Sequence, residues 1–341
     1  MLGAPRPPIH EQVIVITGAS SGIGLATARM AAHRGASVVL VARSETKLQT
    51  VVDELRERGG EATYVVADVA EADQVERAAH IACERYGGID TWFNNAATSI
   101  LAPISEVDLD DARRLFDVNF FGYINGCRAA LPALRRAESG LIVNMGSLLS
   151  DRTAPLQGMY AATKHAVKAY TDTLRMELER EDAGVAVTLI KPTSVNTPYA
   201  LHGMNLLDVE PSLPAPIYDP EVVARAVVDV FERPRRDVYI GAASRVLSFV
   251  GMTLPRATDY VSNWFFVDAQ LDGPSDDAPW EGTLHEPDDR EEPQTHGKLE
   301  KHVCKSSLYT RARLHPARAL AGLGIIAAGL WGSLRLARRS R

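Results

Sequence analysis

The amino-acid sequence predicts an α/β fold: a doubly wound parallel sheet of about seven strands with helices on both faces, followed by a C-terminal extension. Short apolar runs alternate with longer stretches whose apolar residues recur at helical spacing, which is typical of βαβ units. The first unit passes from strand to helix through a glycine-rich turn between Gly18 and Gly24. A turn of this kind indicates a nucleotide-binding site.

Each expected strand is a short apolar run, as in strands that a parallel sheet buries on both faces. The strands are expected at 13–17, 37–42, 62–67, 90–93, 140–145, 185–191 and 237–241. The helices are expected at 25–34, 45–58, 72–86, 110–137, 159–181 and 220–231. Ligands of such sheets bind beyond the carboxyl ends of the strands, so one crevice is expected to collect the residues that follow them: Gly18, Asp68, Asn95 and Ser147.

The three glycines of the first turn each have a separate physical purpose. Gly18 permits a tight turn, Gly22 lets the backbone approach a pyrophosphate, and Gly24 allows the helix to pack closely on the strand. The N–H groups and the positive end of the following helix favour phosphate groups.

A tyrosine, a lysine and a serine form a second group of candidate functional residues. Tyr160 and Lys164 are four residues apart and share one face of a predicted helix, and Ser147 lies upstream, after an expected strand. The ammonium group favours the phenolate, so it is expected to lower the tyrosine pKa from about 10. Such a trio suits proton exchange with an alcohol or carbonyl oxygen. The alternative is a core tyrosine beside a surface lysine.

These motifs, with three others in the same order, resemble those of the short-chain dehydrogenase/reductase superfamily from about residue 11 to about residue 241. The turn reads Thr17-Gly18-x-x-x-Gly22-x-Gly24, Asp68-Val69 matches the pair that meets the adenine, and residues 94–97 read Asn-Asn-Ala-Ala where the family has Asn-Asn-Ala-Gly. The resemblance implies a single-domain Rossmann fold with strand order 3-2-1-4-5-6-7. It also implies a catalytic tetrad, here Asn119, Ser147, Tyr160 and Lys164.

The resemblance also implies which residues contact a nicotinamide dinucleotide. They are Gly18, Ser20, Ser21, Gly22, Ile23, Gly24, Arg43, Asp68, Val69, Asn95, Ala96, Tyr160, Lys164, Pro192, Val195 and Thr197. The chain has Pro192-Thr193 where the family has Pro-Gly, so the loop that covers the nicotinamide is expected to run differently here. No metal site is expected, because the three cysteines form neither a CxxC pair nor a ligand-like cluster.

The cofactor prediction depends on the end of the second strand. An enzyme that uses NAD normally has an acidic residue there for the ribose 2′-hydroxyl, whereas this chain has Ala42 and then Arg43. Because arginine pairs well with a 2′-phosphate, NADP(H) is favoured and NAD(H) is the other possibility. Arg43 could instead be a solvated residue at a strand end.

The predicted function is therefore hydride transfer between NADP(H) and a small-molecule carbonyl or alcohol, by the Ser-Tyr-Lys-Asn mechanism. In the family the segment after Thr197 forms a lid, here about 198–217, whose apolar residues favour a hydrophobic substrate or only pack the lid onto the core. Leu148, Leu149, Leu156 and Met159 are expected to border the same pocket. Two alternatives remain: a catalytically weak nucleotide-binding scaffold or sensor, and an NAD-preferring alcohol dehydrogenase.

Composition and the ends of the chain complete the predictions. A net charge of −6 argues against a nucleic-acid partner, and the start of the first strand a dozen residues in leaves no room for a secretory signal. The expected organisation is a Pro-rich arm at 1–10, the oxidoreductase domain at 11–270, a poorly ordered acidic linker at 271–297 and a basic tail at 298–341. The location is expected to be cytoplasmic. The tail holds an apolar helix at 319–334, for which membrane association and docking on protein are the alternatives. A homo-oligomer is expected by resemblance, paired through helices 110–137 and 159–181.

Overall fold

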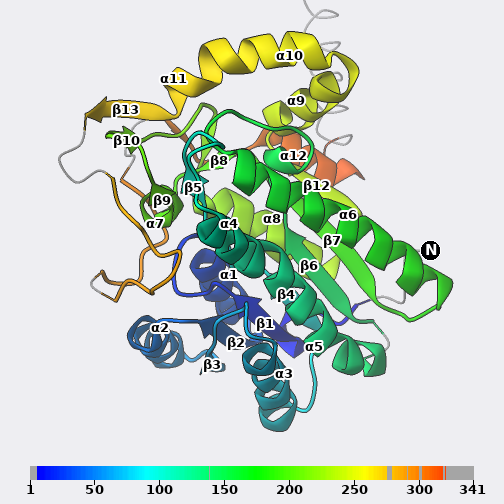
Figure 1. Cartoon of the computed structure of the whole chain (residues 1–341). Coiled ribbons are helices and arrows are strands. Elements are labelled where there is room, and N and C mark those ends of the chain that lie inside the picture. Colours follow the sequence, from blue (N-terminus) through cyan, green and yellow to red (C-terminus); the bar gives the residue numbers. More distant parts are fainter. Residues whose placement is uncertain are drawn as a thin grey trace, which may run out of the picture.

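A seven-stranded parallel sheet with helices on both faces forms the centre of the molecule (Figure 1). The computed structural model describes residues 6–137, 139–274, 279–289, 291–298, 302–317 and 319. The strands of the sheet are β1 Val13–Thr17, β2 Ser37–Ala42, β3 Ala62–Val66, β4 Thr91–Asn94, β6 Leu141–Met145, β7 Ala186–Pro192 and β12 Asp237–Ile240. Their order is β12-β7-β6-β4-β1-β2-β3, which confirms the predicted fold class and strand order.

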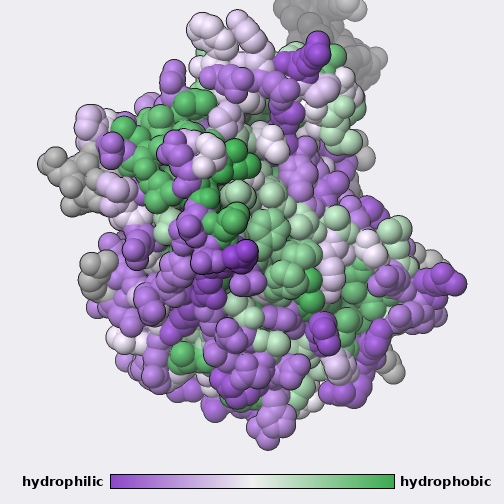
Figure 2. All heavy atoms as spheres, viewed as in Figure 1, coloured by the Kyte–Doolittle hydropathy of each residue, from purple (hydrophilic) through white to green (hydrophobic). Residues whose placement is uncertain are grey.

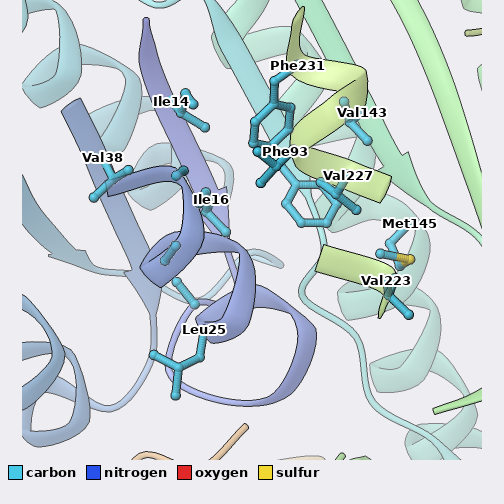
Figure 3. Close-up of a cluster of buried hydrophobic side chains, with 14 of the residues drawn as sticks. Ile14, Ile16, Leu25, Val38, Phe93, Val143, Met145, Val223, Val227 and Phe231 are labelled. Carbon is cyan, nitrogen blue, oxygen red and sulfur yellow. The ribbon is translucent and has the colours of Figure 1, made fainter. Parts of the chain in front are cut away.

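Alternate residues of each strand face two separate layers of helices. Ile14 and Ile16 of β1 pack with α1 Gly22–His33, α2 Glu45–Glu57 and α8 Pro220–Glu232, whereas Val13 and Val15 pack toward α3 Ala72–Tyr86, α5 Gly122–Arg136 and α6 Gly158–Arg180. Figure 3 shows the first of these clusters, in which Phe93 and Phe231 meet edge to face with ring centroids 6.2 Å apart. Both faces of the sheet are therefore buried, as the apolar strand sequences require.

The expected helix over 110–137 is interrupted in the structure. It consists of α4 Leu109–Phe116, a π-helical segment η2 Asp117–Phe121, and α5. The interruption contains Asn119, whose side chain is fully buried. Single π-helical turns inside α-helices often occur at functional sites.

Short elements beyond the sheet form the lid, residues 198–217, and its surroundings. They are β5 Ile100–Leu101, η3 Leu148–Ser150, β8 Ser194–Val195, α7 Tyr199–His202, β9 Met204–Asn205, β10 Val209–Pro211 and β11 Ile217–Tyr218. The chain continues through α9 Ala242–Thr253, α10 Pro255–Val261, η4 Ser262–Phe266, α11 Val267–Ala269, β13 Leu271–Pro274, β14 Val303–Cys304 and α12 Leu308–Leu314. Before β1 lies the single turn η1 Ile9–Glu11.

The C-terminal extension differs from the solvated linker that its acidic sequence predicts. β13 pairs with β10, β14 pairs with β11, and Trp280 forms a bridge with Asn205. We call residues 282–289 and 291–297 the strap; it lies beside the lid and the start of α1 (Figure 1, orange). Acidic composition did not predict this packing because backbone groups make many of the contacts.

The apolar run at 319–334 lies outside the described residues except for Ala319. Within the part of the chain that the structure describes, no helix has the length and apolarity needed to cross a bilayer.

Candidate active site

One cavity of about 360 Å³ opens at the carboxyl ends of the central strands. With two exceptions, Gly24 and Asn119, all the residues predicted to bind the cofactor or to catalyse the reaction line this cavity. Strands β1, β2, β4, β6 and β7 each end at its wall, so the parallel sheet brings together residues that are far apart in the sequence.

The glycine-rich turn forms the floor of the cavity between β1 and α1. Gly18 and Gly22 both have positive φ, of 65° and 55°, which explains the glycine at each position. A Cβ on Gly24 would lie 2.1 Å from the carbonyl oxygen of Gly18, so this glycine brings the helix against the turn rather than facing the cavity. Asn95, which follows the neighbouring strand β4, holds the turn in place. Its side-chain amide donates to Thr17 O at 3.0 Å and to Gly18 O at 3.2 Å.

The start of α1 has the chemistry to bind an anionic group. Its N-cap residue Ser21 makes no side-chain capping bond and lines the cavity with Ser20 and Ile23. Orphan N–H groups and the helix dipole make such an end attractive to phosphate. The turn therefore fits the diphosphate of a dinucleotide.

Ser147 stands between β6 and the short helix η3. Its Oγ accepts a hydrogen bond from Leu149 N at 3.1 Å, and its N–H donates to Ser150 Oγ at 3.1 Å. This capping box fixes the serine backbone at the cavity wall while leaving the hydroxyl hydrogen able to donate elsewhere.

Tyr160 and Lys164 lie one turn apart on α6, and both are buried. Burial raises the pKa of Tyr160, and its hydrogen bonds with Tyr199 and Ser147 oppose the rise. The expectation that this pKa lies below its ordinary value is therefore wrong. Burial of the phenol is the largest cause of the rise, and Lys164 Nζ lies 5.6 Å from the Tyr160 ring centroid.

The ammonium group of Lys164 donates hydrogen bonds to two neutral acceptors. It donates to Met145 O at 2.9 Å and to Tyr123 Oη at 3.2 Å. Burial consequently lowers the pKa of Lys164 to about 7. Tyr123 is a residue that the sequence did not single out, because its position beside Lys164 arises only when α5 packs near α6.

Asn119 lies behind the cavity wall instead of in it. Its Nδ2 donates to Thr98 O at 2.8 Å and to Thr163 Oγ1 at 3.2 Å, and its Oδ1 accepts from Thr98 N at 2.9 Å. The side chain thus ties the π-helical segment to the loop after β4 and to α6. Its amide is engaged in these bonds.

The far end of the cavity carries several charges. Arg43 and Asp68 line it after β2 and β3, and the Asp68 carboxylate pairs with Arg114 of α4. Burial lowers the pKa of Arg43, which Asp68 opposes. Lys47, in the first turn of α2, also lines this end, so two cations face it. Sequence reasoning missed Lys47 and Arg114, because only the fold brings them to the site.

The end of β7 and the segment after it form another part of the wall, next to the glycine turn. Pro192, Val195 and Thr197 line the cavity, and a Cβ on Gly22 would lie 3.2 Å from Thr197 Cβ. Ser194 and Val195 pair with β11, which fixes the path of this loop where Thr193 replaces the family glycine.

The lid side of the cavity is mostly apolar. Leu148 and Leu149 border it as expected, with Tyr199, Met204 and Leu213 from the lid. Met159 instead packs with the Ile100 and Leu115 cluster, and Leu156 is not among the residues that form the wall. The rings of Tyr160 and Tyr199 lie 5.7 Å apart between centroids, so the lid reaches the phenol of Tyr160. Figure 2 shows hydrophobic residues over β10 and β13, where the lid meets the extension.

A possible metal-ligand group occurs among the described residues outside this cavity. Asp219, Glu221 and His296 lie close together, with His296 Nε2 3.3 Å from Asp219 and 3.2 Å from Glu221. Asp219 also caps α8, so the group has an ordinary structural explanation.

Comparison with known proteins gives a consistent result. Residues 12–202 match the family model described as short chain dehydrogenase. The chain is 46% identical over 253 residues to the uncharacterized oxidoreductase YxnA of Bacillus subtilis, covering 74% of this chain and 71% of that protein.

Two solved structures have the same fold. The chain is 28% identical, with a TM-score of 0.65, to a short chain dehydrogenase/reductase from Burkholderia phymatum in complex with NAD, covering 72% of this chain and 95% of that one. It is 29% identical, with a TM-score of 0.60, to an alcohol dehydrogenase from Thermococcus sibiricus complexed with 5-hydroxy-NADP, covering 67% and 95%.

Proposed function

The chain belongs to the short chain dehydrogenase family of oxidoreductases, and on that premise we propose that it transfers a hydride between NADP(H) and a hydrophobic carbonyl or alcohol. One observation carries the proposal. A phenol, a serine hydroxyl and a lysine line the same cavity as a glycine-rich helix start and the cationic group of Arg43 and Lys47. The cavity therefore offers proton chemistry at one end and anion binding at the other.

The residues divide the chemistry between them. A bound nicotinamide dinucleotide supplies the hydride or accepts it. Ser147 donates a hydrogen bond to the substrate oxygen, where negative charge develops during reduction. Tyr160 donates a proton to that oxygen in reduction and takes it back in oxidation. Lys164 holds the ribose hydroxyls, and Asn119 fixes the π-helical segment that supports α6 at this point.

Replacement of the phenol tests the assignment directly. We expect Tyr160→Phe to lower kcat at least 100-fold while the Kd for NADPH stays within about twofold, because only proton transfer is lost. NADPH consumption with a panel of aldehydes, ketones and quinones gives the activity, and fluorescence titration gives the Kd. Near-normal turnover would contradict the role of Tyr160, and no NADPH or NADH consumption with any substrate would favour a nucleotide-binding scaffold.

The preference for NADP(H) is proposed from charge at the adenosine end. β2 ends at Ala42 without an acidic residue for a 2′-hydroxyl, while Arg43 and Lys47 both line the cavity. A 2′-phosphate would meet two cations there. A 2′-hydroxyl would not find, at the end of β2, the carboxylate that normally accepts its hydrogen bond.

Single and double substitutions test this preference. We expect Arg43→Ala to reduce kcat/KM for NADPH at least 10-fold relative to kcat/KM for NADH, with Lys47→Met adding to the effect. The NADPH to NADH ratio of kcat/KM is the measurement. An unchanged ratio in the double variant would assign the preference elsewhere.

A hydrophobic substrate is proposed from the lid side of the cavity. Leu148, Leu149, Met204 and Leu213 surround the space next to Tyr160. Apolar walls with a few polar groups are the usual form of a small-molecule site. The substrate panel distinguishes this proposal, because long-chain or ring-containing carbonyl compounds should have lower KM values than short polar ones.

A further inference from the structure

The strap lies between the lid and the adenosine end of the cavity, and its first part is firmly anchored. The N–H of Thr283 donates to His202 O at 2.7 Å. The Leu284 side chain is fully buried in the cluster that contains Leu115 and Met204. Gly282 has φ +61°, and a Cβ there would lie 2.4 Å from His202 O, so the strap backbone sits directly on the lid.

Three successive carbonyl groups of the strap accept hydrogen bonds from arginines at the adenosine end. Arg43 donates through Nη2 to Thr283 O, and through Nη1 to His285 O at 2.8 Å. Arg114 donates through Nε to Leu284 O at 3.1 Å. The guanidinium group proposed to hold a 2′-phosphate is thus already engaged by neutral acceptors of the same chain.

The second part of the strap meets the other end of the dinucleotide site. Gln294 O accepts a hydrogen bond of 2.9 Å from the N–H of Gly22, the first residue of α1. Gly297 N then donates to Asn196 O at 3.1 Å, which holds the strap to the loop after β7. N–H groups at a helix start are the ones that bind a phosphate, so a carbonyl oxygen occupies a donor suited to the diphosphate.

Between these anchors the described residues of the strap are exposed or half-buried, and several are acidic. Glu286, Asp289, Glu291 and Glu292 are exposed, and the cavity wall includes Pro287. A segment with few buried apolar groups opens at low cost. Its carboxylates also repel a polyanionic dinucleotide. The strap can therefore open at low cost, and repulsion between its carboxylates and the dinucleotide favours the open state.

We propose that the strap is a built-in competitor of the cofactor: its carbonyl groups accept hydrogen bonds from Gly22 N–H and Arg43, and they must leave both before a nicotinamide dinucleotide binds. This inference rests on the proposed function, which takes the cavity to be the dinucleotide site. When only a fraction of molecules is open, the apparent Kd equals the intrinsic Kd divided by that fraction. Loosening the anchor of the strap should therefore tighten binding.

Two variants with matched controls test the proposal. Leu284→Ala removes the buried anchor, and Leu308→Ala is its control, since that leucine is 80% exposed. Gly282→Ala pushes the strap off the lid, and Gly273→Ala is its control, since a Cβ there meets nothing within 4 Å. We expect both strap variants to bind NADPH with a Kd about 5- to 10-fold lower and with faster association in stopped-flow fluorescence, and both controls to match the wild type. Circular dichroism checks folding, and Gly282→Ala carries the test if Leu284→Ala does not fold.

Limited proteolysis of the wild type gives a readout that needs no turnover. A glutamyl endopeptidase should cut after Glu291 faster when NADPH is present, because the strap has been displaced. Protection by NADPH, or weaker binding with faster dissociation in the strap variants, would make the strap a cover and overturn the proposal. Unchanged binding and cleavage would overturn it as well. If neither NADPH nor NADH binds to the wild type or to any variant, the proposed function itself fails.

Discussion

At the scale of single residues, Lys164 is unusual because its ammonium group is buried beside neutral acceptors. The side chain is 1% exposed and bonds to Met145 O and Tyr123 Oη. Burial lowers its pKa to about 7, against an ordinary value of 10.5. With this pKa, the charged and the neutral forms of Lys164 are both populated near neutral pH.

This titration predicts how stability depends on pH. Between about pH 7 and pH 10.5 the unfolded chain binds the lysine proton and the folded chain does not, so the free energy of unfolding rises with pH. We expect the free energy of unfolding of the wild type minus that of Lys164→Met to increase by about 1.4 kcal/mol per pH unit in this window. Urea unfolding without cofactor at pH 6 to 9.5 measures it. A difference that stays flat with pH would show that Lys164 remains charged.

Residue types with a fixed spacing could be predicted from the sequence, whereas their environment could not. Ser147, Tyr160 and Lys164 share the cavity because strand ends and helix turns place them there. The direction of the Tyr160 pKa was mispredicted, since the argument from a nearby ammonium took no account of burial. Tyr123 and Lys47 gave no local signal, because their proximity to the site depends on packing between distant elements.

At the scale of elements, the seven strands of the sheet were predicted with every end correct to within one residue. Strands buried on both faces are continuous apolar runs, and polar residues or glycines mark their ends clearly. The π-helical turn at Asp117–Phe121 could not be predicted, because it depends on the bonds of Asn119 to Thr98 across a loop. The strap was missed for a similar reason, since backbone carbonyls make its bonds and leave no pattern in the side chains.

The contact of α5 with β4 gives a prediction at this scale. A Cβ on Gly126 would lie 2.1 Å from Asn94 Oδ1 and 2.5 Å from Trp92 Nε1, which hydrogen-bond each other at 2.7 Å. Alanine gains up to about 1 kcal/mol of helix propensity, but overpacking a buried polar pair costs more. We expect Gly126→Ala to lower the free energy of unfolding by about 2 kcal/mol in urea titration. Gly88→Ala, whose Cβ meets nothing within 4 Å, is the control, and equal stability of the two variants would contradict the argument.

At the scale of the whole molecule, two exposed apolar residues lie on the helices that the family resemblance assigns to subunit pairing. Phe121 follows α4 and is 49% exposed, and Met176 on α6 is 57% exposed. Figure 2 shows hydrophobic residues on the face formed by α5 and α6. Exposed apolar patches of this kind commonly mark an interface between protein chains.

Substitution at this face should change the oligomeric state. We expect the wild type to be a dimer or tetramer and Met176→Glu with Phe121→Glu to shift it toward monomer, because a charge in a C2 interface occurs twice. Light scattering after size exclusion measures the mass. Leu308→Glu at the start of α12, a residue that is 80% exposed, is the control and should leave the mass unchanged. A monomeric wild type would refute the pairing.

The attachment of the strap to the lid has a consequence for the sequence of events in a catalytic cycle. His202 belongs to α7 of the lid, and its carbonyl group holds Thr283 of the strap. If the strap moves as proposed, opening of the adenosine end of the cavity and opening of its lid side are coupled, so cofactor and substrate cannot enter or leave independently. Steady-state kinetics would then follow a compulsory order, with the dinucleotide arriving before the organic molecule and departing after it.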